Sequence, residues 1–399
     1  MSQPAIRVAV LQQAPDFSLV TGGPLFQLFR KTHLSGDHLQ LLYRRIIVIT
    51  ATAWLPLFLL STLQAPEGGV VLPFGHDIET HVRLLVALPV LILAELIVHL
   101  RLRSVMQGFI TPNIVAPEEV PKFNAAIDSA MRLRNSIVLE VGLLVLVFSV
   151  GQWFWWKEIA LGTSSWYAVP ERGHITLTAA GYWNAFVSVP IFQFILARWY
   201  LRLLIWTRLL WQISRRLHLH LIAAHPDRAG GLSFLGRSSY AFSPILFAQG
   251  SVLAGVIASR VVYAGENLLT FKVLAVGFIA VYLIFVLGPL TLFTPQLTRA
   301  KREGLARYAL LANQYVKAFE TKWVKEAAGH EGELLGSGDI QSLADMGNSF
   351  NVVREMRPIP FNVQDITRLA AATAAPLLPL GLTMFSLEEL ITRLIKVLF

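Results

Sequence analysis

Long apolar stretches recur along this chain and restrict its fold more than any other feature. A membrane-spanning helix needs about 20 mainly apolar residues to cross roughly 30 Å of hydrocarbon. Stretches of that length begin at Ile46 and recur toward the C-terminal end. Only 15% of the 399 residues are charged, whereas soluble domains carry about 25%. The sequence therefore predicts an all-α, polytopic membrane protein with six or seven transmembrane helices and cytosolic helical extensions.

The transmembrane bundle is expected to extend from residue 46 to residue 294, with a further span after it. The six predicted spans of the bundle are 46–64, 84–102, 137–156, 180–206, 244–264 and 271–294. A seventh span is predicted at 366–385, although Pro376 and Pro379 interrupt it. Proline inside a membrane helix leaves a kink because neighbouring groups satisfy the freed carbonyl.

The distribution of lysine and arginine predicts the orientation, because cytosolic loops carry an excess of these residues. The segment 1–45 holds five of them, whereas the loop 65–83 holds only Arg83. We therefore expect residues 1–45 to be cytosolic, in a plasma membrane or a bacterial inner membrane. Residues 296–365 then form a cytosolic helical region, and residues 386–399 form an amphipathic helix at the interface.

The net charge of +9 does not indicate nucleic acid, because the basic residues flank the apolar segments. The expected partners are the lipid bilayer and anionic lipid headgroups. A second copy of the chain is a further candidate partner, through small residues at Ser251, Gly255 and Ser259 that permit close helix packing. The absence of cysteine excludes disulfides and thiolate metal sites.

Charged residues inside the predicted spans form the first candidate site. Glu95 lies in the middle of the second span, where an unpaired carboxylate costs about 2.5 kcal/mol or more. His99 follows one turn later on the same helix face. Glu140, Arg198 and Arg202 fall at similar depths on two other spans. These five residues form either an ion path through Glu95 and His99 or a salt-bridge network that orders the helices.

The segment HPDRAGGL is the second candidate site. It contains His225, Asp227, Arg228, Gly230 and Gly231. Proline, aspartate and the two glycines favour a tight turn, in which the carboxylate accepts backbone N–H or arginine hydrogen bonds. An alternative is an anion site made by glycine N–H groups beside the arginines.

A divalent metal is a further alternative for this segment. Imidazole and carboxylate groups bind zinc and similar ions. The candidate ligands are His218, His220, His225 and Asp227, although their spacing matches no standard zinc motif.

Three functional hypotheses follow. The first is a channel or transporter for protons or small ions, with Glu95 and His99 as its titratable groups. The second is a non-transporting scaffold or sensor whose basic cytosolic face, residues 215–237, binds a ligand or partner. The third is a membrane-embedded metalloenzyme. Motifs of the GxSxG, HExxH and kinase types are absent, which disfavours an enzyme of those classes.

Overall fold

Helices make up nearly all of the regular structure. The computed structural model describes residues 17–32, 41–63, 73–110, 114–159, 165–171, 174–325 and 338–384. Within these ranges the strands form one short antiparallel hairpin, β1 (Ala168–Glu171) with β2 (His174–Leu177). The expected all-α class is confirmed apart from this hairpin.

Six helical stretches are long and apolar enough to cross a membrane in the part of the chain that the structure describes. They are Leu42–Leu63, Ile78–Ile110, Ala179–Arg216, Ser233–Tyr263, Leu268–Lys325 and Val363–Thr383. A seventh crossing is possible if Pro117–Arg134 and Ile137–Gly151 count together, although the chain bends by 45° between them. Each predicted span overlaps one of these stretches or the bent pair. The predicted interfacial helix at 386–399 lies outside the described residues.

Shorter elements divide these stretches. In the first half of the chain the helices are α1 (Pro24–Lys31), α2 (Leu42–Leu63), α3 (Ile78–His81), α4 (Leu88–Ile110), α5 (Val120–Arg134), α6 (Ile137–Leu146), α7 (Gln152–Ile159) and α8 (Ala179–Trp183). In the second half they are α9 (Val189–Arg216), α10 (Ser233–Ser238), α11 (Ser243–Tyr263), α12 (Lys272–Leu287), α13 (Thr294–Phe319), α14 (Gly338–Arg354) and α15 (Val363–Ala374).

Two π-helical turns have a direct cause in the sequence. Val82–Ala87 precedes Pro89, and Asn184–Ser188 precedes Pro190. A proline ring inside a helix clashes with the carbonyl four residues earlier and removes one hydrogen bond. The wider π-type turn accommodates that clash while the stretch remains helical.

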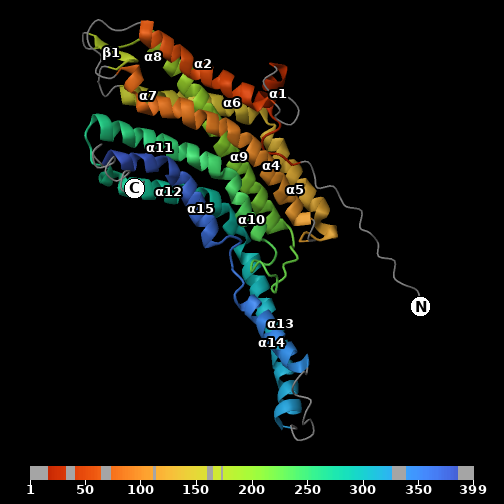
Figure 1. Ribbon diagram of the computed structural model, residues 1–399. Helices are drawn as coiled ribbons and strands as arrows, with labels where there is room; N and C mark the ends of the chain where they lie inside the picture. The colour runs from red at the N-terminus through yellow and green to blue at the C-terminus, as the bar shows by residue number, and fades with distance from the viewer. Residues whose placement is uncertain are drawn as a thin grey trace.

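The predicted cytosolic region 296–365 adopts a shape that the sequence did not indicate. Helices α13 and α14 pack against each other as an antiparallel pair that extends away from the bundle (Figure 1). The first part of α13 contacts the end of α9, where Gln296 Nε2 donates to the carbonyl of Leu217 at 3.1 Å. The pair α13–α14 is called the arm below.

The last described helices close one side of the bundle. Asn362 and Asp365 form a capping box at the start of α15, because each side chain accepts a hydrogen bond from the other's backbone N–H. The small-residue stripe of α11 is used within the chain. Gly255 lies close to Val82 and Glu79. A Cβ at this position would be 3.3 Å from Val82 Cβ and 3.4 Å from Glu79 Cα.

Candidate functional site

A buried cluster of opposite charges joins α2, α4, α6 and α9. Arg202 Nη2 donates to Glu95 Oε1 at 2.8 Å, and Arg198 Nη1 lies 4.0 Å from the same oxygen. Arg45, at the start of α2, pairs with the second oxygen of Glu95. Arg198 also reaches Glu140, with Nη2 3.1 Å from Oε1. The sequence placed four of these residues at similar depth, and the structure brings them into contact.

The segment 17–31 covers this cluster, and we call it the N-terminal strap. Its first four described residues, Phe17 to Val20, are at most 2% exposed. The Oγ of Ser18 lies 2.8 Å from Nδ1 of His99, and Arg134 Nη1 donates to the carbonyl of Ser18 at 2.5 Å. The backbone N–H of Leu25 donates to Glu140 Oε2 at 2.8 Å. His99 therefore contacts the strap through Ser18.

Two glycines allow the strap to turn over the cluster. Gly22 and Gly23 have φ angles of 146° and 89°, which side-chain-bearing residues rarely adopt. A Cβ at Gly22 would overlap the guanidinium of Arg134. The strap and the cluster therefore form one packed unit.

The charges of this cluster lie in mutual contact. Buried ions are costly unless partners and hydrogen bonds compensate them, and here each carboxylate faces at least one arginine. Removing Glu95 would leave the buried arginines Arg45 and Arg202 without the carboxylate that each contacts. These features match the salt-bridge interpretation of Glu95, Glu140, Arg198 and Arg202.

The HPDRAGGL segment forms a tight loop around one carboxylate. Asp227 Oδ1 accepts the N–H groups of Ala229 and Gly231 at 2.8 and 3.1 Å. Its Oδ2 accepts the N–H of Ser233 at 3.0 Å. His225 Nδ1 lies 2.8 Å from Oδ1. Burial would raise the pKa of Asp227, but these N–H groups and the adjacent imidazole outweigh burial and lower the pKa.

The backbone of this loop requires its glycines. Gly230 and Gly231 have φ angles of 63° and 96°, and Arg228 has 55°. The carbonyl of Arg228 accepts the N–H of Arg357 at 2.7 Å, and the Arg228 side chain pairs with Glu355 at 2.9 Å. The predicted tight turn is thus present, and it fastens the loop to the chain that follows α14.

The structure does not assemble the predicted metal site. No group of three or more His, Asp or Glu side chains is placed to hold a metal ion within the described ranges. His225 is beside Asp227, but His218 instead lies 3.7 Å from Glu119. The backbone N–H of His220 donates to Ile114 in a short bridge with the loop before α5. Of the predicted ligand set His218, His220, His225 and Asp227, the contacts described here thus bring together His225 and Asp227.

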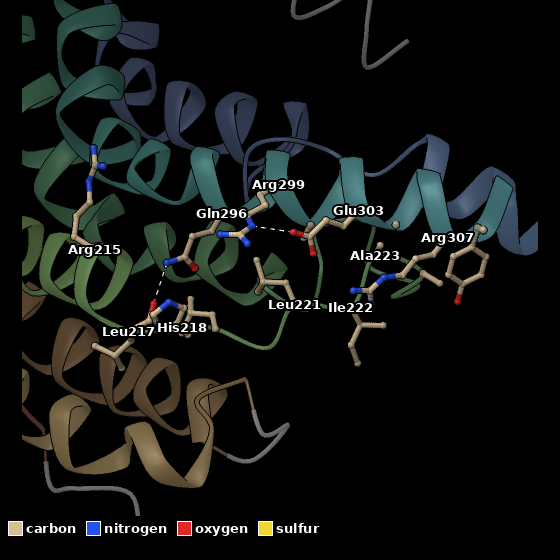
Figure 2. A pocket seen from close by; sticks show the side chains of 15 residues that line it. Arg215, Leu217, His218, Leu221, Ile222, Ala223, Gln296, Arg299, Glu303 and Arg307 are labelled. Atoms are coloured by element: carbon tan, nitrogen blue, oxygen red, sulfur yellow. Dashed lines mark hydrogen bonds and ion pairs between the residues drawn. The ribbon is translucent and has the colours of Figure 1, made fainter. Parts of the chain in front are cut away.

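A groove of about 650 Å³ lies between the end of α9, the segment that follows it, and α13. Figure 2 shows arginines approaching this space from both sides. Arg299, Glu303 and Arg307 recur every four residues on one face of α13, and Arg299 Nε donates to Glu303 Oε1 at 2.8 Å. Arg215 and His218 line the opposite wall. The basic groove, as we call it, is completed by Leu217, Leu219, Leu221, Ile222, Ala223, Ala224, Gln296, Ala300, Gly304 and Tyr308.

Close packing of α13 on the loop shapes this groove. Gly304 is buried against Ala223 and Val353, so that a Cβ there would overlap the Ala223 side chain. Gln296 Nε2 donates to the carbonyls of Ser214 and Leu217, which ties α13 to the end of α9. One wall of the groove is therefore held against the other by specific contacts.

Comparisons with known proteins do not assign the chain to a family. No family model, no curated protein and no solved structure matches the chain. The site is accordingly described from its own geometry.

Several functional residues escaped the sequence interpretation. Arg45 was counted in the polar segment 1–45, yet it is the fourth residue of α2 and is buried. Its position directly before an apolar run was the available signal. No local pattern indicated that Ser18 would contact His99, or that Arg215, Arg299 and Arg307 would line one groove.

Proposed function

We propose that this protein is a membrane-embedded, non-transporting sensor or scaffold that binds a phosphate-bearing ligand in its basic groove. The observation that carries the proposal is the charge of the groove, in which three arginines and a histidine accompany one carboxylate. Arginine matches phosphate geometry through paired N–H donors. The groove volume also falls within the range of about 300–1,000 Å³ typical of small-molecule sites.

The groove is proposed to open to the cytosol. It lies at the end of α9 that carries Arg208, Arg215 and Arg216, and such basic flanks favour the cytosolic side. Because the chain contains no cysteine, the variant Ser342→Cys on the arm provides a single reporter. In sealed cells an impermeant maleimide should leave this cysteine unlabelled until the membrane is opened. Labelling of intact cells would place the groove outside.

Ligand binding is tested with protein in phosphatidylcholine nanodiscs, titrated with inorganic triphosphate in a calorimeter. The double variant Arg299→Gln, Arg307→Gln should weaken binding by about tenfold or more, because hydrogen bonds to charged groups contribute about 1.5–3 kcal/mol each. Arg260→Gln is the matched control, since Arg260 is an exposed arginine of α11 whose partner is Glu266. Equal affinity in all three proteins, or no binding by the unaltered protein, would reject the proposal.

Transport of protons or small ions receives less support. Glu95 and His99 were the predicted titratable pair, but Glu95 is paired with arginines and His99 contacts Ser18. Liposomes containing the protein should therefore show no proton or monovalent-ion flux above that of protein-free liposomes. A flux that Glu95→Gln reduces would reinstate the transport hypothesis.

A further inference from the structure

A second groove, of about 310 Å³, lies between the C-terminal part of α4 and α10. It is separate from the basic groove and shares none of its lining residues. We call it the α4–α10 groove. Its lining consists of Arg101, Ser104, Val105, Phe234, Arg237 and Ser238.

The lining combines positive charge with an apolar wall. Arg101 and Arg237 are exposed, and neither forms an ion pair with any residue that the structure describes. No carboxylate lines the groove. Two such cations favour an anion with several oxygen acceptors. Val105 and Phe234 supply apolar contact beside them, which suits a ligand that joins a phosphate to a nonpolar portion.

The position of the groove on α4 indicates what that nonpolar portion is. Leu93 and Leu100 are 40% and 60% exposed, and they lie seven residues apart on one helix face. Ser104 lies one turn beyond Leu100 on this face, and Arg101 lies two turns beyond Leu93 along the edge of the same face. Along a single face the helix thus changes from exposed leucine to exposed arginine, as it does where hydrocarbon ends and lipid phosphates begin.

We propose that the α4–α10 groove binds an anionic phospholipid. Arg101 and Arg237 hold its phosphate, the hydroxyl of Ser104 lies beside the headgroup, and an acyl chain follows Leu100 and Leu93. A phosphate group is present both in a lipid headgroup and in a free phosphate anion, so the two arginines alone do not distinguish these ligands. The continuous apolar face of α4 selects the lipid.

Native mass spectrometry of the detergent-solubilised protein tests this site with added phosphatidylglycerol. Arg101→Gln with Arg237→Gln should lower the affinity by about tenfold or more, since two charged hydrogen-bond donors are lost. Arg103→Gln should bind as the unaltered protein does, because Arg103 is an exposed arginine on another face of the same turn. All variants should elute as folded protein in size-exclusion chromatography.

A second titration separates the two phosphate sources. Inorganic phosphate and glycerol 3-phosphate should neither bind detectably nor displace phosphatidylglycerol at matched concentrations. If either binds in the same arginine-dependent way, the site is one for a soluble anion and the lipid assignment is overturned. Undiminished phosphatidylglycerol binding by the double variant would overturn the site itself.

Discussion

Arg202 on α9 donates a hydrogen bond to Glu95 on α4 at 2.8 Å, across 107 positions of the chain. Both side chains are buried, and Arg45 and Arg198 share the same carboxylate. Glu95 on α4 is thus the common counter-ion of three arginines on two other helices, α2 and α9. This relationship defines the bundle more directly than any apolar contact, because an unpaired ion cannot be accommodated by small shifts in packing.

Glu95→Gln should destabilise the protein strongly, because it removes the carboxylate that buried Arg45 and Arg202 contact and leaves Arg198 with Glu140 alone. Removing one partner of a buried ion pair costs about 3–5 kcal/mol. The matched control is Glu266→Gln, which breaks the exposed pair with Arg260 and should cost about 0–1 kcal/mol. Unfolding in mild detergent, followed by circular dichroism, measures both. Equal stability of the two variants would show that Glu95 is not a structural ion.

Asp227→Asn should loosen the HPDRAGGL loop. The amide oxygen can still accept the N–H groups that Oδ1 accepts, but an NH2 group would then face the N–H of Ser233. Leaving that donor unsatisfied costs about 1–3 kcal/mol. Hydrogen exchange of the peptide containing Ala229, Gly231 and Ser233 should become faster. Asp345→Asn, on the exposed face of α14, serves as the control and should leave this peptide unchanged.

The same carboxylate gives the loop a pH dependence. The pKa of Asp227 is lower in the folded protein than its ordinary value, so the ionised form stabilises the loop fully above about pH 4. That contribution is lost as the pH falls through the lowered pKa. Protection of the loop N–H groups, measured relative to the intrinsic exchange rate at each pH, should therefore decrease below about pH 4 in the unaltered protein and change less in Asp227→Asn. An unchanged acid response in the variant would assign the effect to another group.

Gly304→Ala should damage the basic groove without altering any charged residue. The added methyl group would overlap Ala223 and press on Val353, and such overpacking costs about 1–3 kcal/mol. The loop would move away from α13, and triphosphate binding should weaken. Gly347→Ala in α14 has open space around the new methyl group, so it should stabilise the arm by about 0.5–1 kcal/mol. Calorimetry measures the triphosphate affinity of both variants. Unaltered binding by Gly304→Ala would contradict the close packing of Gly304 against Ala223.

Ser18→Cys tests whether the N-terminal strap is docked in solution. The replacement is nearly isosteric, and Ser18 is 2% exposed, so maleimide should label it far more slowly than Ser342→Cys on the exposed side of α14. Adding Arg134→Gln removes the hydrogen bond to the Ser18 carbonyl and should accelerate labelling. Equal rates for the two single cysteines would show that the strap does not cover the charge cluster.

Apolar patterning predicted the helical stretches because lipid imposes a length and a composition on each one. The sequence predicted residues 296–365 as a helical region but not the arm, because the pairing of α13 with α14 depends on contacts between two separate helices. The capping box at Asn362 was predictable because its two partners are three residues apart. The contact between Ser18 and His99 was not, because the pairing depends on how four separate helices pack. The similar depth of Glu95, Glu140, Arg198 and Arg202 grouped these four residues. Arg45 was left out because the first span was predicted to begin at residue 46, whereas α2 begins at Leu42.

The charge cluster also imposes an order on biogenesis. Arg45 leaves the ribosome before Glu95, and both precede Arg198 and Arg202. The helix α2 therefore carries an uncompensated cation through insertion until α4 arrives, and neutralisation is complete only when α9 has been released. The strap precedes all of these helices in synthesis, yet its binding surface is made from α4, α5 and α6. The earliest of these segments to be translated is thus among the last to reach its final position.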